Sequence, residues 1–339
     1  MDITLNQLRP LRPYTSNREV APAFWALSIL WLPMATGVQT GNHLTFIEQE
    51  MVAGNGPPAH FHPYDEGFYI LEGEIIFRVG GATHRVGAGT ALHIPRLVQH
   101  SFTVETPSRV LNFYPASGFE LLLFGMGQPA AERRPPTPQE TSPLPPEQLA
   151  TLLRLGGHVN VGTPSHPPVP ADYVTHPVAW SPSAPFLTTA AQSPTYAALG
   201  SQWTLLLGSG RTAGSYALFD RLVLALPEAA ARPIMERHAE QEALYVLSGT
   251  LRVELDGQVT DAPAGTFVFI PAGTVHAMTA LGGPARTLNF YLPGGFERGI
   301  TDFGQRLDAQ GQPTGENREA EMYLFFDQVG THRLPPPLG

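Results

Sequence analysis

The chain has 339 residues, of which 42% are hydrophobic, and a formal net charge of −9. This length predicts about two domains, and the apolar content is sufficient for a core in each. Because the basic residues form no cluster, the sequence argues against a nucleic-acid partner. The chain has neither cysteine nor lysine, which excludes disulfides, thiolate ligands, a cysteine nucleophile and Schiff-base chemistry.

The balance of residue types favours β-structure. Only 14% of the residues are charged, whereas 34 glycines and 35 prolines mark many turns between short segments. An apolar run over residues 23–38 is interrupted by Pro33, starts too late for a signal peptide and is too short to span a bilayer. We therefore expect no membrane association and, by default, a cytoplasmic location.

In chain order, the first half of the sequence alternates short apolar segments with glycine or proline. These segments predict strands over residues 44–52, 68–71, 75–79, 90–94, 101–105 and 110–114. Their length and spacing are typical of a sandwich or jelly-roll barrel. We therefore predict an all-β fold of jelly-roll barrels with a few short helices.

The middle of the chain, from about residue 128 to residue 170, is rich in proline. This composition predicts a linker over residues 129–172, between an N-terminal barrel (1–128) and a C-terminal barrel (173–339). Leucines at helical spacing, followed by two glycines, predict one short helix over residues 147–155 of the linker. We expect this helix to pack across the junction of the barrels.

The second half of the chain repeats the first. A shift of 176 residues aligns five pairs: Glu66 with Glu242, Gly73 with Gly249, Gly89 with Gly265, Pro95 with Pro271 and His100 with His276. A shift of 177 aligns residues 111–114 with 288–291, both of which read Leu-Asn-Phe-Tyr. A loop insertion of one residue explains the change of shift. The repeat predicts an intramolecular duplication, with one barrel in each copy.

Four residues of the first copy have the spacing of metal ligands: His60, His62, Glu66 and His100. Side chains alternate faces along a strand, so His60 and His62 point the same way, and Glu66 and His100 come from neighbouring strands. Such a set suits one divalent ion of Fe, Mn, Co, Ni or Cu in each active barrel, and suits zinc less well. Four protein ligands leave one or two positions open for substrate or dioxygen.

The second copy keeps three of these four residues. His238, Glu242 and His276 match the first copy, but Glu236 takes the place of His60. Glu236 has the parity to face the same side as His238, so a second metal site with two histidines and two carboxylates is one interpretation. The other is a former site, now held by hydrogen bonds or by an arginine. The first barrel is therefore the better candidate for catalysis.

The spacing of these residues, with the glycines and prolines around them, resembles the two sequence motifs of the cupin superfamily, and the duplication resembles a bicupin. The first motif fits without a departure. In the second motif, Leu97 and Val104 stand where the family usually has glycine and asparagine; the second copy has Gly273 and Ala280 there. The departure leaves the shape of this turn open but keeps His100 as a ligand.

Segments near the first motif, over residues 40–48, 57–62 and 68–73, are similar to the quercetin 2,3-dioxygenase group. This resemblance implies that the 3-hydroxyl of a flavonol binds the metal and that dioxygen opens the heterocycle with release of carbon monoxide. It also implies that three histidines, His60, His62 and His100, hold the metal. Glu66 would then be both a ligand and the general base that accepts the hydroxyl proton.

The prediction for function is therefore a metal-dependent dioxygenase that cleaves the heterocyclic ring of a flavonol, with a small aromatic substrate and dioxygen as its partners. Two alternatives stay open. One is an isomerase or decarboxylase that uses the metal as a Lewis acid without oxygen. The other is a non-enzymatic cupin that binds a small ligand. The sequence leaves the oligomeric state open, with a homodimer as one option.

The remaining aromatic and histidine side chains are expected to serve packing. Phe68 and Ile70 share the parity of Glu66 and face either the core or the cavity, with the core favoured. We expect His93, the repeat partner of Phe269, to be packed in the protein rather than to be a fifth ligand. We expect His84 to lie at the surface beside a turn, and Trp25 and Trp31 to pack on the barrel exterior.

Overall fold

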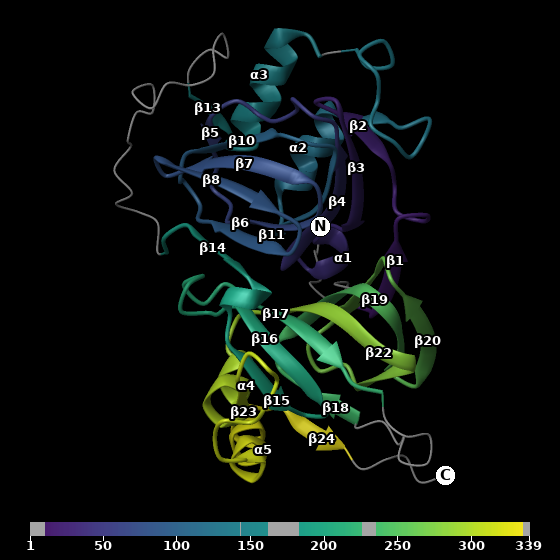
Figure 1. Cartoon of the computed structure of the whole chain (residues 1–339). Coiled ribbons are helices and arrows are strands. Elements are labelled where there is room, and N and C mark those ends of the chain that lie inside the picture. Colours follow the sequence, from purple (N-terminus) through teal and green to yellow (C-terminus); the bar gives the residue numbers. More distant parts are fainter. Residues whose placement is uncertain (1–10, 143, 162–182, 226–234, 335–339) are drawn as a thin grey trace, which may run out of the picture.

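The structure is a computed structural model that describes residues 11–142, 144–161, 183–225 and 235–334. Two β-barrels lie one above the other, one built mainly by the N-terminal half of the chain and one mainly by the C-terminal half (Figure 1). The fold is all-β, with a few short helices, and the prediction of two jelly-roll barrels is confirmed.

The first barrel consists of two sheets. The larger has eight strands in the order β12 (Gln128–Pro129), β2 (Phe24–Ala26), β3 (Ile29–Ala35), β4 (Leu44–Met51), β11 (Ser108–Pro115), β6 (Glu66–Glu72), β9 (Thr90–Ile94) and β14 (Phe186–Thr189). The smaller has five strands in the order β13 (Val159–Asn160), β5 (His60–Phe61), β10 (His100–Val104), β7 (Glu74–Val79) and β8 (Ala82–Gly87). The six strands predicted for this half correspond to β4, β6, β7, β9, β10 and β11, and all six are confirmed.

The second barrel is one continuous sheet of eleven strands. Its main path is β1 (Tyr14–Asn17), β21 (Thr266–Ile270), β19 (Gln241–Leu255), β22 (His276–Leu292), β17 (Ala217–Val223), β16 (Ser201–Leu207), β15 (Thr195–Ala198) and β23 (Gln305–Leu307). Off this path lie β18 (Met235–Arg237), β20 (Gln258–Pro263) and β24 (His332–Leu334). The sheet is continuous because the long strands β19 and β22 pair along most of their length, with shifts of register around Ser248.

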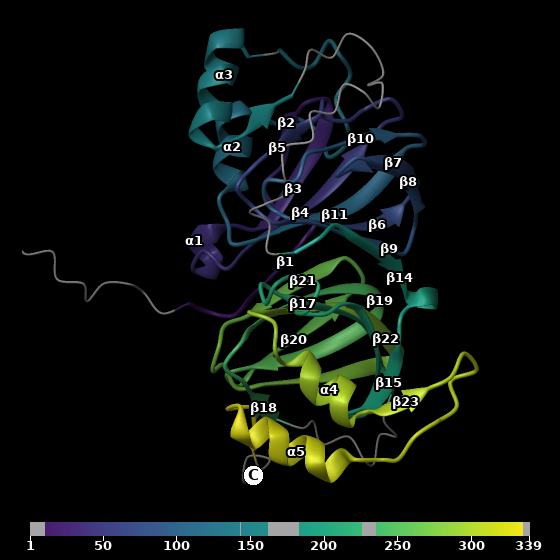
Figure 2. The same cartoon turned by 90° about the vertical axis from the view of Figure 1, so that its left-hand side faces the viewer.

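Short helices lie at the barrel ends and connections: α1 (Gly37–Thr40), α2 (Phe119–Met126), α3 (Pro146–Leu155), α4 (Glu297–Phe303), α5 (Glu319–Gln328) and the 3₁₀ turn η2 (Ala190–Gln192). Figure 2 shows α2 and α3 at the first barrel and α4 and α5 at the second. Within the described residues, none of these helices has the length and hydropathy needed to cross a membrane.

Every second side chain along a strand points into the first barrel, and these side chains fill its interior. On β7, Ile75, Phe77 and Val79 are buried, whereas the residues between them are less buried. The central strands β6 and β11 of the larger sheet are buried on both faces, because one face lines the barrel and the other packs against the second barrel. Phe68 therefore belongs to the barrel interior, and its neighbour Tyr69 belongs to the interface between the barrels.

Aromatic side chains from both barrels form that interface. The rings of Phe46 and Phe267 lie 4.7 Å apart, and those of Phe113 and Phe290 lie 4.8 Å apart. The barrels also exchange strands: β1 pairs with β21 of the second barrel, and β14 pairs with β9 of the first. The two barrels therefore share one hydrophobic core at their contact.

The predicted helix of the proline-rich segment is confirmed as α3, but it does not pack across the junction of the barrels. It lies against α2, where Leu152 fills the space above Gly125, and the strand after it, β13, pairs with β5. The cause is the apolar face of α3, which covers the open end of the first barrel. The last part of the predicted linker, from residue 162, lies outside the described residues.

Candidate metal centre

The three histidines of the first motif converge inside the first barrel. His60 on β5 stands opposite His100 on β10, and the side-chain nitrogens of His60, His62 and His100 lie within 4.8 Å of one another. Each Nδ1 hydrogen-bonds a backbone carbonyl close by in sequence: Pro58 for His60 at 2.8 Å, Tyr64 for His62 at 3.0 Å and Val98 for His100 at 2.8 Å. A carbonyl only accepts, so each Nδ1 donates its proton to the backbone, and each Nε2 is the ring nitrogen directed at the common centre.

Glu66, at the start of β6, completes the set. Its Oε2 lies 3.2 Å from His62 Nε2 and 3.0 Å from His100 Nε2. Its Oε1 accepts hydrogen bonds from Tyr114 at 2.6 Å and from Asn112 at 2.9 Å. Burial alone would raise the pKa of Glu66, but its close contacts with His100 and His62 hold that pKa well below its usual range. Glu66 is therefore a buried carboxylate with one oxygen fixed by protein donors and the other directed at the histidines.

These four side chains fit a divalent metal ion. The Nε2 of His100 is buried and has no aligned hydrogen-bond partner within the described residues, which is costly unless an ion accepts its lone pair. Burial and the neighbouring histidines lower the pKa of His60 well below its usual value, so its imidazole is neutral, as a metal ligand requires. The backbone carbonyls that fix each Nδ1 are the outer partners commonly seen around metal-bound histidines.

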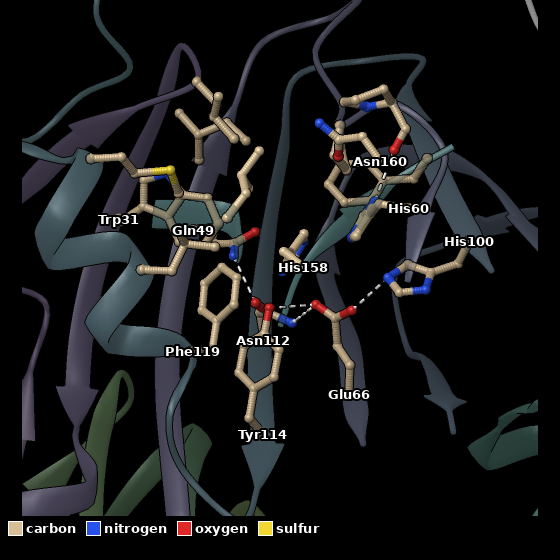
Figure 3. A pocket seen from close by; sticks show the side chains of 18 of the residues that line it. Trp31, Gln49, His60, Glu66, His100, Asn112, Tyr114, Phe119, His158 and Asn160 are labelled. Carbon is tan, nitrogen blue, oxygen red and sulfur yellow. Dashed lines mark hydrogen bonds and ion pairs between the residues drawn. The ribbon is translucent and has the colours of Figure 1, made fainter. Parts of the chain in front are cut away.

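A cavity of about 160 Å³ opens onto this set (Figure 3). A single water needs only about 10–15 Å³, so the cavity has room for a larger molecule. His60, Glu66 and His100 line it, and apolar and aromatic side chains form most of the remaining wall: Leu27, Ile29, Trp31, Phe68, Phe102, Tyr114, Phe119, Leu122, Met126, Leu149 and Leu153. Among the described residues that line the cavity, none is an arginine.

One residue of this wall differs from the sequence prediction, and for a second the structure decides between two options that the sequence left open. Trp31, predicted on the barrel exterior, faces the cavity, because its indole nitrogen hydrogen-bonds Ala26 inside the barrel at 2.9 Å. Phe68 lines the cavity as well as the core, whereas Ile70 is packed in the core alone. Trp25 packs outside the barrel as predicted, where Arg134 lies 5.9 Å from its ring.

His158 is a cavity residue that the sequence prediction missed. It follows α3, and its imidazole stacks on His60 with ring centroids 4.6 Å apart and lies 5.0 Å from the ring of His62. Burial and the charges of nearby histidines lower the pKa of His158 to about 3, so the ring is neutral. The sequence marks Gly156 and Gly157 as a helix stop, but nothing in it marks the following His158 as a residue of the first barrel.

Two further histidines considered in the sequence, His93 and His84, lie away from the site. His93 is confirmed as a packed residue: its ring nitrogens share hydrogen bonds with Tyr216 of the second barrel at 3.1 Å and with Ser183 at 3.0 Å. His84, predicted at the surface beside a turn, lies on β8 near the turn at Gly80 and Gly81, and it is partly exposed.

The turn before His100 keeps its shape although the glycine of the family pattern is absent. Leu97 adopts a left-handed conformation with φ of 64°, and its N–H donates to the carbonyl of His62 at 2.8 Å. Gly273 of the second barrel has a φ of 77° and makes the same bond to His238 at 2.8 Å. The left-handed leucine costs about 1 kcal/mol, which the turn tolerates.

In the second barrel, His238, Glu242 and His276 also converge, with ligand atoms within 4.8 Å of one another. Glu242 Oε2 lies 3.1 Å from His238 Nε2 and 3.4 Å from His276 Nε2. Glu236 contributes an oxygen 3.7 Å from His276 Nε2. Burial would lower the pKa of His276, but the hydrogen bond and charge of Glu242, with the charge of Glu236, raise it to about 9. The two centres therefore differ in charge: one has a single carboxylate and the other has two.

The same structural unit closes each barrel. In the first it is α3, Gly157 and β13; in the second it is α5, Gly330 and β24. The backbone N–H of His158 donates to Leu153 at 2.8 Å, and that of Thr331 donates to Phe326 at 2.8 Å. These matching bonds make Thr331 the counterpart of His158, and Phe326 the counterpart of Leu153.

Comparison with known proteins agrees with this architecture. A family model described as the cupin domain matches the chain twice, over residues 47–114 and 222–291. No curated protein matches. Protein Ylba from E. coli has a TM-score of 0.53 at 12% identity, over 84% of this chain and 92% of that chain. A variant of oxalate decarboxylase from Bacillus subtilis has a TM-score of 0.55 at 14% identity, over 83% of this chain and 77% of that chain.

A second structure of the Bacillus subtilis oxalate decarboxylase, described as having Mn(II) centres, has a TM-score of 0.54 at 14% identity, over 83% of this chain and 77% of that chain. At such identities the likeness shows the fold alone. Together with the two matches of the cupin model, one in each barrel, it shows that this chain has a bicupin-like fold. Each domain holds a cluster of histidine and carboxylate side chains suited to a metal ion.

Proposed function

We propose that this protein is a metal-dependent dioxygenase that opens the heterocyclic ring of a flavonol or a similar aromatic enediol. The observation that carries the proposal is the cavity of the first barrel, which is walled by aromatic and aliphatic side chains and ends on His60, Glu66 and His100. A flat aromatic molecule suits such walls, and only its polar edge would meet the imidazoles and the carboxylate. The resemblance of residues 40–48, 57–62 and 68–73 to the quercetin 2,3-dioxygenase group agrees with this choice.

The residues of the site have separable roles in this proposal. His60, His62, His100 and Glu66 would hold the metal, which when bound supplies a Lewis acid and positions for the substrate hydroxyl and dioxygen. Tyr114 and Asn112 occupy Oε1 of Glu66, so Oε2 is the oxygen left to accept the proton of the 3-hydroxyl. The apolar walls exclude water from the reacting ring.

The test is turnover of quercetin by protein loaded in turn with Mn, Fe, Co, Ni and Cu. We expect the flavonol absorbance to disappear and dioxygen to be consumed in equal amount with at least one metal. Glu66→Gln should lower kcat by about 10²–10⁴-fold, as expected for loss of a general base, whereas Glu242→Gln in the second barrel should not. Failure to consume dioxygen or flavonol with all five metals would refute the proposal.

A decarboxylase of small carboxylic acids is the second candidate, because solved structures of oxalate decarboxylase share the fold over 83% of the chain. It would act without net consumption of dioxygen on a strongly anionic substrate. The described lining of the first cavity offers no arginine to bind such a substrate, which favours the aromatic one. Release of carbon dioxide from oxalate, without oxidation of quercetin, would reverse this preference.

A further inference from the structure

We propose that His158 is a positioning residue: its imidazole hydrogen-bonds the molecule that occupies the cavity at the metal centre. The residue comes from the segment that follows the first barrel, and so lies far in sequence from the ligand motifs. The inference rests on the metal site of the proposed function but not on the flavonol. It concerns any ligand that enters the cavity and reaches the four-residue set.

The position of His158 is the first step of the argument. Its ring lies 4.6 Å from that of His60 and 5.0 Å from that of His62, centroid to centroid. His158 lines the cavity together with His60, Glu66 and His100. In Figure 3 it stands between the side of the cavity that holds Phe119 and the side that holds His60. A ligand that reaches the centre through this cavity therefore lies beside the imidazole of His158.

The hydrogen bonding of His158 differs from that of the three predicted ligands. Their Nδ1 atoms are each tied to a backbone carbonyl, whereas the Nδ1 of His158 is buried and has no partner among the described residues. Buried polar groups are normally satisfied, and exceptions concentrate where a bound molecule completes the bonding. With its tautomer unfixed by the protein, the ring can donate to a bound oxygen or accept from a bound hydroxyl.

The backbone holds His158 firmly in this place. Its N–H donates to Leu153 at 2.8 Å, and β13 pairs with β5 so that Asn160 stands opposite His60. The next residue, Val161, donates to Ala59 at 2.7 Å. The imidazole is thus mounted on a strand that is hydrogen-bonded to the strand of a predicted metal ligand, which suits a positioning role.

The second barrel supplies an internal comparison. There the same closing unit carries Thr331 in place of His158 and Phe326 in place of Leu153. Phe326 stacks on Phe296 with centroids 4.9 Å apart, so a bulkier ring takes the place of the leucine. The histidine therefore occurs in the copy whose leucine leaves room for a ligand and whose four predicted ligands include three histidines.

The test uses azide as the probe, because azide binds an open metal position whatever the natural substrate is. The full chain is loaded with Co(II), and azide is titrated while the visible absorption of the metal is followed. We expect His158→Leu to raise the apparent Kd for azide about tenfold, the effect of one lost hydrogen bond to an anion, at unchanged cobalt content. His158→Gln should stay within about threefold of the wild type, because the amide still hydrogen-bonds.

Thr331→Val, at the matching position of the second barrel, is the control and should leave the titration unchanged. The proposal would be overturned if His158→Leu bound azide as tightly as the wild type, or if this variant lost its cobalt. It would also be overturned if the wild type bound no cobalt or no azide. Anaerobic titration with quercetin separates the two proposals. If the azide result holds and quercetin does not bind, the assigned substrate is wrong and the role of His158 stands.

Discussion

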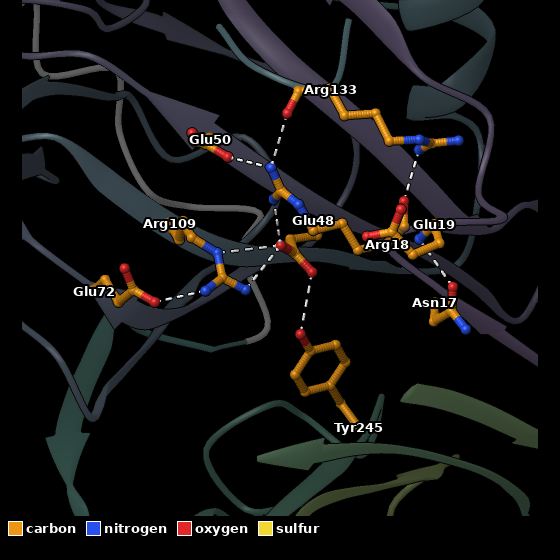
Figure 4. A network of polar contacts seen from close by, with 9 residues as sticks. All are labelled: Asn17, Arg18, Glu19, Glu48, Glu50, Glu72, Arg109, Arg133 and Tyr245. Carbon is orange, nitrogen blue, oxygen red and sulfur yellow. Dashed lines mark hydrogen bonds and ion pairs between the residues drawn. The ribbon is translucent and has the colours of Figure 1, made fainter. Parts of the chain in front are cut away.

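The carboxylate of Glu48, which is fully buried on β4 of the first barrel, accepts a hydrogen bond of 3.1 Å from the hydroxyl of Tyr245 in the second barrel (Figure 4). Two arginines neutralise it: Arg18 donates at 2.9 Å and Arg109 at 3.0 Å. Because Arg18 also bonds Glu50 and Arg109 also bonds Glu72, Glu48 is the centre of a network that spans the contact between the barrels.

Removal of the charge of Glu48 should destabilise the whole chain. Glu48→Gln removes the charge that Arg18 and Arg109 share, although each arginine keeps a second carboxylate, so the loss of the charged acceptor should cost about 1.5–3 kcal/mol of unfolding free energy. Urea unfolding measures this change. Glu105→Gln is the matched control, since its partner Arg85 is exposed and the pair is worth less than about 1 kcal/mol. Equal loss in both variants would show that the network contributes little.

A second prediction concerns the stability of the fold in acid. Burial lowers the pKa of His93 to about 4, although the charge of Asp65 opposes the shift. Between pH 6.5 and pH 4, His93 is therefore protonated in the unfolded chain but neutral in the folded chain. The free energy of unfolding falls as the pH drops through this range. The loss attributable to His93 is about 3 kcal/mol between pH 7 and pH 4.

His93→Phe places the residue of the second copy, Phe269, in the first. This variant should be less stable at pH 7, because the hydrogen bonds that His93 makes with Tyr216 and Ser183 are lost, but its stability should vary less between pH 7 and pH 4. Urea unfolding at several pH values measures the slope. His84→Phe, on the partly exposed strand β8, is the control and should keep the slope of the wild type. An unchanged slope in His93→Phe would contradict the prediction.

The sequence predicted the barrels well because their information is local. The alternation of apolar and polar residues, the glycine turns and the 176-residue repeat can all be read directly from the sequence. These signals predict strands such as β4, β6 and β7 and the convergence of the four ligand residues. The cavity wall was less predictable. Whether Trp31 faces inward depends on the pairing of β2 with β3, which no local pattern fixes.

The closing unit of each barrel was missed for a related reason. His158 and Thr331 occupy matching places, but the segments around them share little more than Gly157 and Gly330. The proline-rich composition predicted a linker. The short helix within it has one apolar face, but its sequence does not indicate which surface that face covers. Only the pairing of β13 with β5 and of β24 with β18 reveals the correspondence.

The two centres should bind metal with different dependence on pH. The pKa of His276 is raised to about 9, so a metal in the second barrel must displace a proton at neutral pH, whereas His60 is already neutral. We expect His100→Ala to remove the metal of the first barrel. The site in the second barrel should remain, and its affinity for the metal should rise about tenfold per pH unit between pH 6 and pH 9. His276→Ala should leave one site without this dependence on the histidine proton.

Mass spectrometry of metal content after dialysis at each pH measures both effects. A single metal per chain that disappears with His100→Ala and is unaffected by His276→Ala would show that the second cluster is held by its own ion pairs, as between His276 and Glu242. Loss of both metals in either variant would indicate that the barrels do not bind independently.

The difference between Leu153 and Phe326 predicts how the first cavity can be closed without harm to the metal site. Leu153 lines the cavity and is partly exposed, and Phe326 at the matching place is buried against Phe296. Leu153→Phe should therefore fill part of the cavity and weaken quercetin binding by at least about tenfold, with metal content unchanged, because no predicted ligand is altered. Anaerobic titration and metal analysis of the same sample measure the two quantities.

Leu155→Phe, at an exposed leucine two residues further along, is the control and should behave as the wild type. Undiminished binding in Leu153→Phe would place the substrate outside this cavity, whereas loss of metal would mean that the larger ring displaces the ligands themselves.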